Sequence, residues 1–316
     1  MANLVHPGVQ PPGQAATARP FLKWAGGKSQ LLAQLQAHFP PDLASGKINR
    51  YVEPFVGSGA VFLRIVQEHA IDQVLLSDLN PELILLYRTI QQNVEGVVAA
   101  LERLQSSYLE LDEPGRQAFY YRLRSQYNTG RGRSDFERYS TGWVARTTQA
   151  LFLNRTGYNG LFRVNRRGEY NVPFGRYKNP RLLDPANLRA VAHLLQGVRL
   201  EYGDFAQGEH FVDRHTFVYF DPPYRPVSRT ANFTHYAREV FGDAQQLRLA
   251  SFYRALDLKG ARLMLSNSDP QDINPTDDFF QQAYNGFRIE RLRASRNINS
   301  NPERRGPISE LLILNY

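Results

Sequence analysis

The fold is decided by residues 51–78, YVEPFVGSGAVFLRIVQEHAIDQVLLSD. The apolar run at 51–55 predicts a strand, and the glycines within 56–59 predict a tight turn. Residues 60–69 then have the periodicity of a helix, and a second apolar run at 73–78 predicts another strand. A strand, a helix and a strand in this order form a βαβ unit with parallel strands. The sequence therefore predicts an α/β protein.

The pattern changes on either side of this unit. Before it, the glycine-rich turn at 21–28, FLKWAGGK, leads into a helical spacing of apolar residues at 31–39. After it, separate helical patterns occupy 81–92 and 94–109, and more are expected between 115 and 152. The alternation of strands and helices is thus interrupted.

Strand patterns return in the second half of the chain. They lie at 198–202, 216–220, 262–266, 287–292 and 311–314, with a helical pattern at 244–256. We expect a mostly parallel sheet with helices on both faces, formed by residues 19–84 and 195–316. Residues 85–194 are expected to form an inserted, mainly helical domain, and residues 1–18 a disordered tail.

Composition bounds the possible partners. The chain of 316 residues carries 38 Lys and Arg against 30 Asp and Glu, a net charge of +8, and its pI is about 9.7. This balance favours a polyanionic partner. The absence of cysteine excludes disulfides, thiolate catalysis and cysteine-bound zinc.

The chain has no signal for secretion or membrane insertion. No apolar stretch approaches the ~18 residues of a spanning helix, and the first residues lack a basic and then apolar pattern. We expect a cytoplasmic protein that binds no membrane.

The glycine turn predicts a nucleotide site. Gly57 and Gly59 allow close approach of a ligand to the backbone, and Asp78, at the end of the next strand, is placed to bind a ribose hydroxyl. Phe62 stands where a dinucleotide motif has its third glycine, which favours a nucleoside cofactor without phosphates. The alternative is a structural turn, with Asp78 capping the helix that Pro81 begins.

Asp221-Pro222-Pro223-Tyr224 follows the apolar run 216–220 directly. Proline fixes φ near −65° and has no N–H, so this turn presents oxygen acceptors beside an aromatic ring. Such a shelf suits a flat ligand with an exocyclic amine. An ordinary turn remains the alternative for this motif alone.

Several ordered segments resemble the Dam family of adenine-specific DNA methyltransferases. They are FLKWAGGK at 21–28, EPFVGSGAVF at 53–62, SDLNPEL at 77–83, the hairpin region 151–180, YGDF at 202–205, DPPY at 221–224, SRTANFTHY at 228–236 and ELLILNY at 310–316. The resemblance implies a Rossmann-like core that uses S-adenosylmethionine, with an inserted target-recognition domain carrying a β-hairpin.

The implied reaction is methyl transfer to the N6 amine of adenine. The amine is a poor nucleophile because its lone pair is delocalised into the ring. We expect Asp221 and the carbonyl of Pro222 to accept its two N–H groups while Tyr224 stacks on the base. Neither a covalent enzyme intermediate nor a metal is implied.

The cofactor residues follow partly from the turn and partly from the resemblance, which places Trp24 against S-adenosylmethionine, Lys28 near its carboxylate, and Asp204 and Phe205 beside its adenine. A buried, unpaired Lys28 would be costly, which favours an anionic partner. The expected cofactor-binding residues are Trp24, Lys28, Phe55, Gly57, Gly59, Asp78, Asp204, Phe205 and Asp221.

A base within a duplex cannot reach the shelf, so the adenine must be flipped out. The resemblance to the family's recognition hairpin suggests that Tyr158 fills the gap, and Arg163 is suited to a bidentate contact with guanine. Leu161 and Pro173 are candidates for a thymine methyl, and Lys23 for an outer base pair. The full set of expected DNA-binding residues is Lys23, Tyr158, Asn159, Leu161, Arg163, Arg166, Arg167, Pro173, Arg176 and Lys178.

Two other classes of function remain open at this stage. A cytosine-N4 or RNA methyltransferase faces the same electronic problem, although cytosine enzymes more often have a Ser-headed shelf. A DNA-binding protein without catalysis is the third hypothesis. The resemblance motivates GATC as the target, double-stranded DNA as the partner, and a prokaryotic or phage-encoded protein that is associated with the nucleoid through DNA. We expect the protein to be monomeric in solution, with more than one copy on DNA as an alternative. A loop at 295–306, with Arg296, Arg304 and Arg305, is expected to be a flap.

Overall fold

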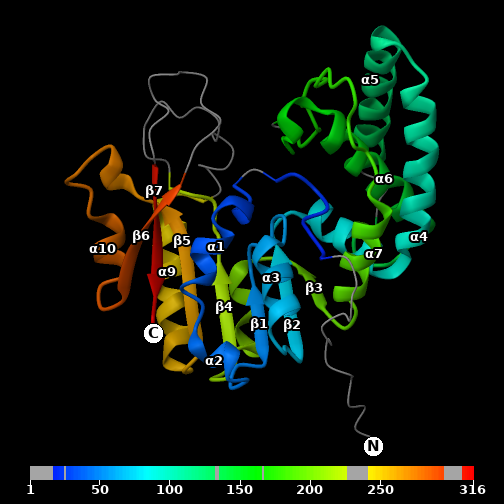
Figure 1. Ribbon diagram of the computed structural model, residues 1–316. Coiled ribbons are helices and arrows are strands. Elements are labelled where there is room, and N and C mark those ends of the chain that lie inside the picture. Colours follow the sequence, from blue (N-terminus) through cyan, green and yellow to red (C-terminus); the bar gives the residue numbers. More distant parts are fainter. Residues whose placement is uncertain (1–16, 25, 132–134, 166, 226–240, 295–307) are drawn as a thin grey trace, which may run out of the picture. The chain divides into compact units, whose positions relative to one another are not determined.

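The structure of the protein is a computed structural model, which describes residues 17–24, 26–131, 135–165, 167–225, 241–294 and 308–316 (Figure 1). Three expectations therefore lie outside the described residues: nearly all of the tail at 1–18, the segment at 228–236 and the flap at 295–306.

The structure contains a seven-stranded sheet (Figure 1). Its strands are β1 (Arg50–Glu53), β2 (Gln73–Asp78), β3 (Arg199–Tyr202), β4 (Thr216–Phe220), β5 (Arg262–Ser268), β6 (Arg288–Ala294) and β7 (Ile308–Leu314). Their order is β3-β2-β1-β4-β5-β7-β6. β1 runs parallel to β2 and β4, and β4 runs parallel to β5, whereas β7 is antiparallel to β5 and β6. The predicted α/β fold with a mostly parallel sheet is confirmed.

The helices lie mainly where the sequence predicted them. They are α1 (Leu32–Gln36), α2 (Pro41–Ala44), α3 (Ala60–Glu68), α4 (Pro81–Leu109), α5 (Glu113–Gly130), α6 (Thr141–Thr156), α7 (Pro185–Leu194), α9 (Asp243–Leu258) and α10 (Phe279–Ala283), with 3-10 turns η1 (Lys28–Gln30), η3 (Tyr158–Gly160), η4 (Phe205–Phe211) and η6 (Pro270–Asp272). The two helical segments expected on either side of residue 93 are found within the element α4, and they are separated at Asn93, whose φ of −151° and ψ of 60° are not helical.

The chain divides into two compact units. Unit 1 comprises residues 1–27, 57–68 and 78–203, and unit 2 comprises residues 28–56, 69–77 and 204–316. The boundaries differ from the predicted domains, because the glycine turn and α3 fall in the same unit as the helices α4 to α7. The division into a core of 19–84 and 195–316 and an inserted domain of 85–194 stays a proposal.

In unit 2, strand β4 organises the core. All five of its residues are buried. Because successive side chains of a strand point to opposite faces, Val218 and Phe220 join the apolar cluster that includes α9. Phe217 points the other way and packs against Phe39 and Tyr51, with ring centroids 5.9 and 5.8 Å away. Both faces of the sheet are therefore covered at β4, and the residues after Phe220 emerge from a rigid strand.

In unit 1, a buried ion pair ties α4 to α6. Arg146 donates from Nε to Glu82 at 2.7 Å, and its guanidinium lies 4.3 Å from the centroid of the Tyr127 ring. The Tyr127 hydroxyl donates to the same carboxylate at 3.2 Å. Because the charges are paired and hydrogen-bonded, their burial is compensated, and loss of either partner would be strongly destabilising.

The expected β-hairpin after α6 contains paired segments without regular strands. Isolated antiparallel bridges join Val164 to Tyr170 and Gly157 to Phe174. Between them, the Asn171 N–H donates to the Arg163 carbonyl at 3.0 Å. This narrow antiparallel pairing carries most of the residues expected to meet DNA.

Candidate active site

The site in unit 2 lies where the strand order reverses. β1 has β2 on one side and β4 on the other, so the sequential order turns round between β1 and β4. Ligands of open parallel sheets bind outside the carboxyl ends of the strands at such a point. Glu53 ends β1 there and is buried, and Asp221 directly follows β4. The fold thus places the predicted shelf at the position that favours ligand binding.

Asp221 is ion-paired with Lys28. The Lys28 Nζ lies 2.7 Å from Oδ1 of Asp221, and only 4% of the lysine side chain is exposed. The expectation that a buried lysine needs an anionic partner is met within the protein itself, by the carboxylate at the head of the shelf. Whether Lys28 also contacts the cofactor stays a prediction.

Burial dominates the acidity of Asp221. It raises the pKa of this carboxyl from its usual value to about 6, against the effect of Lys28, which lowers it. The carboxylate of Glu310 adds a smaller raising effect. A carboxyl with this pKa is mostly ionised at neutral pH and accepts hydrogen bonds, yet it also takes up a proton readily.

Tyr224 is held at its hydroxyl and on one face of its ring. The hydroxyl donates to Glu310 at 2.6 Å, a length typical of a hydrogen bond to a charged acceptor. The Lys28 ammonium lies 4.7 Å from the centroid of the ring. The ring can therefore offer a flat ligand only the face opposite to the ammonium.

Two buried amide side chains form hydrogen bonds with the backbone of the loop that follows β4. The Gln246 Nε2 donates to the Pro223 carbonyl at 2.9 Å, and the Arg225 N–H donates to the Asn267 side chain at 3.2 Å. Gln246 and Asn267 are also joined to each other at 3.1 Å. Sequence reasoning missed both. The polar residues at the end of the strand 262–268 could have indicated Asn267. This strand is parallel to β4, and the carboxyl ends of parallel strands meet at one edge of the sheet.

A second group in unit 2 combines aromatic rings with an ion pair. Phe55 packs on Phe205 and Phe241 at 5.7 and 5.6 Å between centroids. Both oxygens of Asp204 accept hydrogen bonds from Arg248, at 2.6 and 2.7 Å, and this guanidinium lies 4.5 Å from the centroid of the Phe205 ring. The predicted residues Phe55, Asp204 and Phe205 therefore share one group, with Arg248 as a member that sequence reasoning missed.

The glycine turn in unit 1 has the backbone that only glycine adopts easily. The φ of Gly57 is +47° and that of Gly59 is +68°, and a Cβ on Gly59 would lie 2.6 Å from the Tyr87 hydroxyl. The Asp78 carboxylate accepts from the N–H groups of Gly57, at 3.3 Å, and Asn80, at 2.9 Å. Burial raises its pKa to about 6, while these backbone hydrogen bonds lower it.

The alternative role of Asp78 as a helix cap is wrong. Helix α4 is capped by Asn80, whose side chain accepts from the Glu82 N–H at 3.1 Å. Asp78 instead joins the end of β2 to the glycine turn. This arrangement leaves the nucleoside-binding role of Asp78 as a prediction that its geometry supports.

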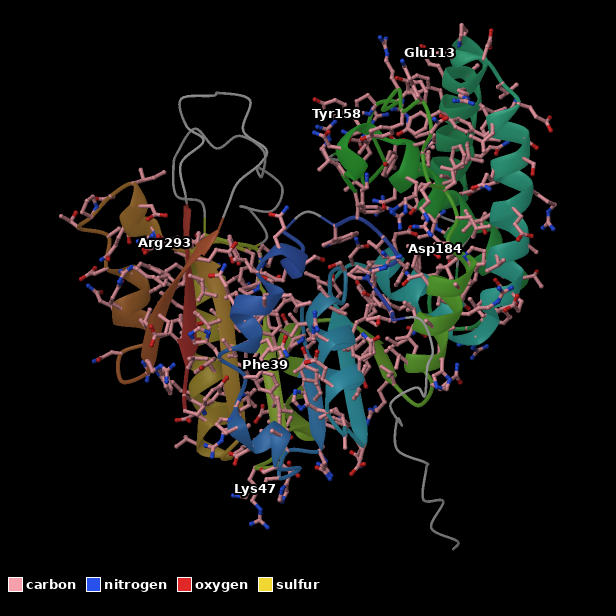
Figure 2. The ribbon with its side chains drawn as sticks, in the orientation of Figure 1. Phe39, Lys47, Glu113, Tyr158, Asp184 and Arg293 are labelled. Atoms are coloured by element: carbon pink, nitrogen blue, oxygen red, sulfur yellow. The ribbon has the colours of Figure 1, made fainter. Side chains whose placement is uncertain are left out.

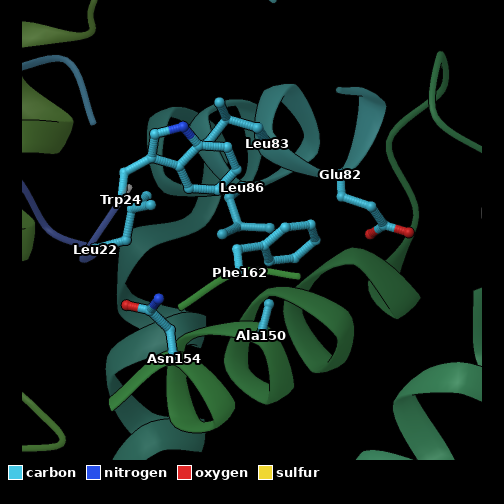
Figure 3. Close-up of a pocket in the computed structure, with 8 residues that line it drawn as sticks. All are labelled: Leu22, Trp24, Glu82, Leu83, Leu86, Ala150, Asn154 and Phe162. Atoms are coloured by element: carbon cyan, nitrogen blue, oxygen red, sulfur yellow. The ribbon is translucent and has the colours of Figure 1, made fainter. Parts of the chain in front are cut away.

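Trp24, also in unit 1, stacks on Phe162. Their rings are 5.3 Å apart between centroids and 24° from parallel. Both line a small pocket with Leu22, Leu83, Leu86, Ala150, Asn154 and Glu82 (Figure 3). The contact packs the FLKWAGGK segment against the base of the hairpin. The expected contact of Trp24 with the cofactor stays a prediction.

The residues expected to bind DNA are mostly exposed and belong to unit 1. The exposed ones are Lys23, Tyr158, Asn159, Arg163, Arg167, Pro173, Arg176 and Lys178. Leu161 is partly buried, and Arg166 lies outside the described residues. Arg163 donates from Nε to the Asn171 side chain at 2.8 Å, which orients a guanidinium that has five N–H donors.

Tyr158 combines a fixed backbone with an exposed ring (Figure 2). Its N–H donates to the Pro173 carbonyl at 2.9 Å, while 54% of the residue is exposed. The next residue, Asn159, has φ +55°, a conformation that is uncommon outside glycine. The Tyr158 ring is therefore open to solvent on a turn whose backbone is fixed, an arrangement that an exposed structural aromatic would also show.

The geometry and the sequence agree with comparisons to known proteins. Residues 24–298 match the model of the D12 class N6 adenine-specific DNA methyltransferases, and the chain belongs to this family. It is similar to the type II methyltransferase M.MjaIII of Methanocaldococcus jannaschii, with 45% identity over 94% of this chain and 99% of that protein. It is also 36% identical to the DNA adenine methylases of Haemophilus influenzae and Escherichia coli K12, over 94% of this chain and 93% and 95% of those proteins.

The protein is thus an adenine-specific DNA methyltransferase, as the resemblance implied. This assignment displaces cytosine N4, RNA and silent DNA binding as alternatives. The family implies DNA as substrate and S-adenosylmethionine as methyl donor. Among solved structures, a precorrin 8w decarboxylase of Methanobacterium thermoautotrophicum aligns over 90% of this chain and 88% of its own, at 11% identity and a TM-score of 0.34, too low to bear on the fold.

Neither a candidate membrane-spanning helix nor a candidate metal cluster occurs among the described residues. None of the helices there is long and apolar enough to cross a membrane. No cluster of acidic or histidine side chains suited to a metal ion occurs in the same part of the chain.

Proposed function

We propose that the enzyme methylates the N6 amine of an adenine flipped out of duplex DNA, within the sequence GATC. The Lys28–Asp221 ion pair at the head of the Asp-Pro-Pro-Tyr loop carries this proposal. The Asp221 carboxylate is a largely shielded acceptor at the carboxyl edge of a parallel sheet. The Tyr224 ring follows it in the loop and has the Lys28 ammonium on one face.

Asp221 activates the amine by accepting one of its N–H groups. This requires an ionised carboxylate. Neutral pH is above the pKa of Asp221, which is about 6, so most of this carboxyl is ionised. The hydrogen bond favours a tetrahedral nitrogen and stabilises the positive charge that develops on it during attack. The Pro222 carbonyl accepts the second N–H. The two prolines have no backbone N–H, so at this point the loop offers acceptors and no competing donor.

Lys28 favours the ionised form of the Asp221 carboxyl and holds it in position. Its ammonium offsets the burial of Asp221, and without it the pKa of this carboxyl would rise, so that a larger fraction would hold a proton at neutral pH. The proton that the methylated amine releases has Asp221 as its first acceptor within the shelf. Tyr224 stacks on the flipped adenine through the face opposite to Lys28.

The residues present fit S-adenosylmethionine, which supplies a methyl group on a sulfonium centre when it is bound. In unit 1, Gly57 and Gly59 have no side chain that would keep a ligand away from the backbone. The largely buried Asp78 carboxylate beside them is suited to a ribose hydroxyl. In unit 2, Phe55 and Phe205 offer apolar ring surface beside Asp204. Trp24 and Lys28 complete the proposed cofactor set on the strength of the family resemblance.

DNA recognition is proposed for the paired segments after α6. The exposed ring of Tyr158 fills the space that the flipped adenine leaves, and Arg163 reads a guanine from the major groove. Arg167, Arg176 and Lys178 are exposed cations suited to phosphates. GATC follows from the likeness of this segment to the Dam pattern, and the basic charge of the whole chain supports binding to DNA.

Transfer of a labelled methyl group into matched duplexes tests the proposal. One duplex has a single GATC, the second has the same bases in the order GTAC, and the third has GATC already methylated at N6 on both strands. We expect incorporation only into the first. Equal incorporation into the first two would contradict GATC recognition, and incorporation into the third would contradict adenine N6 as the acceptor.

A further inference from the structure

Glu310 on β7 occupies a position that the sheet fixes from both sides. It pairs with Ser268 of β5 and with Leu292 of β6, so its backbone belongs to an interior strand. Leu311 and Ile313 belong to the apolar cluster with α9, and Glu310 therefore points to the opposite face. Tyr219 of β4 and Ser266 of β5 meet on that face, with their hydroxyls 2.9 Å apart.

From this position the Glu310 carboxylate accepts the Tyr224 hydroxyl at 2.6 Å. The same ring has the Lys28 ammonium on one face, 4.7 Å from its centroid, and that ammonium binds Asp221 at 2.7 Å. One lysine therefore joins the aromatic ring and the carboxylate of the shelf, and Glu310 fixes the far end of the ring. All four residues belong to unit 2.

We propose that Glu310 is a positioning residue for methyl transfer, which holds the Tyr224 ring in place for the target base and contributes a second negative charge beside Asp221. The proposal rests on the proposed function of the Asp-Pro-Pro-Tyr loop. A tyrosine ring that is anchored at its hydroxyl and flanked by a cation loses its rotational freedom before the base arrives, so less entropy is lost on stacking.

The charge of Glu310 acts together with the other groups that face Asp221. These are Lys28 from η1, Tyr224 in the loop itself, and the buried Tyr51 and Tyr219 from β1 and β4, both of which also interact with the buried Glu53. Lys28 lowers the pKa of Asp221, whereas Glu310 raises it. Removal of the Glu310 charge should therefore move the pH at which Asp221 ionises to a lower value.

Two substitutions separate the hydrogen bond from the charge. Glu310→Gln keeps an oxygen that accepts the Tyr224 hydroxyl but removes the negative charge. Glu310→Ala removes both, and Tyr224→Phe removes the hydrogen bond while Glu310 stays. Glu290→Gln on neighbouring β6 is the matched control, because Glu290 pairs with Arg288 and is outside the site.

The test measures single-turnover methylation against pH, on a duplex with the site that the wild type methylates, and target stacking with 2-aminopurine in place of the adenine. We expect Glu310→Gln to shift the acidic limb of the rate to lower pH by about half a unit, with the aminopurine signal retained. Glu310→Ala and Tyr224→Phe should each lower the rate about tenfold and alter that signal. The variant that combines Glu310→Ala with Tyr224→Phe should have the same rate as either single variant.

An unshifted acidic limb in Glu310→Gln, together with additive losses in the double variant, would overturn the proposal. Thermal melting of each variant checks that the fold is kept, and Glu290→Gln should behave as the wild type. If the wild type methylates adenine at a sequence other than GATC, the proposed target is wrong, yet the assay still tests Glu310 on that other site.

Discussion

The ammonium of Lys28 lies 2.7 Å from a carboxylate oxygen of Asp221, and both side chains are largely shielded from solvent. The two residues are far apart in the chain, one in a glycine-rich N-terminal segment and the other after the central strand β4. Their pairing couples the charge of the proposed catalytic carboxylate to a residue outside its own loop. The acidity of the site is therefore set by the fold as a whole.

Replacement of Lys28 tests this coupling. Lys28→Gln removes the cation that lowers the pKa of Asp221, so that pKa should rise by about one unit or more above its wild-type value. Asp221 must be ionised to accept the amine, and the rate rises with pH as it ionises. A rise of one unit would leave Asp221 half ionised at pH 7, so we expect a loss of about twofold or more at neutral pH that is recovered in alkaline buffer. A rate profile with an unchanged midpoint would contradict the coupling.

Asp78 gives a prediction for stability. Burial raises its pKa to about 6, so the native state holds the proton more tightly than the unfolded chain does. This contribution to stability is complete below about pH 4 and is lost as the pH rises through about 6. Asp78→Asn should raise the free energy of unfolding near pH 8 by about 1–3 kcal/mol, with no gain at about pH 4.

Urea unfolding at both pH values measures the effect of Asp78→Asn, and the exposed Asp72→Asn is the control. An equal change at the two pH values would mean that the charge of Asp78 is not responsible. The same Asp78 variant should bind S-adenosylmethionine more weakly, because a neutral amide is a poorer acceptor for a ribose hydroxyl.

Arg163 should read sequence, whereas Arg167 should not. Arg163 is oriented by Asn171 at 2.8 Å, and its replacement by Ala is expected to relax the preference at one base pair by about 1–3 kcal/mol. Arg167→Ala should weaken binding to all duplexes equally and reduce the salt dependence. Competition binding with every single-base variant of the site distinguishes the two. A uniform loss for Arg163→Ala would remove its direct role.

Arg248 gives a prediction for cofactor binding. Its two hydrogen bonds to Asp204 and its position over Phe205 fix both residues. Arg248→Met should weaken S-adenosylmethionine about three- to tenfold, as expected for the loss of a positioning hydrogen bond. Arg254→Met, on the same helix α9 and over the ring of Phe287, is the control. Calorimetric titration that finds equal affinities for both variants would contradict the role of Arg248.

The sequence predicted the parts of the site that are local. The strand at 216–220 and the loop after it are adjacent in the chain, and proline geometry dictates how such a loop ends a strand. The glycine turn at 57–59 and the end of β2 belong to one βαβ unit, so their relation follows from the fold class. These features needed no knowledge of distant contacts.

The missing parts depend on pairings between distant segments. Glu310 reaches Tyr224 across 86 positions of the chain, because β7 inserts between β5 and β6. Nothing in the spacing of residues predicts that antiparallel insertion. Gln246 and Asn267 meet the loop for a similar reason, since one lies on α9 and the other at the end of β5. Lys28 was predicted to need an anion, but its pairing with Asp221 required the folded chain.

In the proposed reaction, Asp221 enables methylation of adenine N6 in GATC. Single-molecule sequencing of plasmid DNA from a methylation-free host that expresses either the wild type or Asp221→Ala tests this role, with folding of the variant checked by thermal melting. We expect N6-methyladenine at GATC with the wild type and none with the variant. Methylation that persists in a folded Asp221→Ala protein would contradict it.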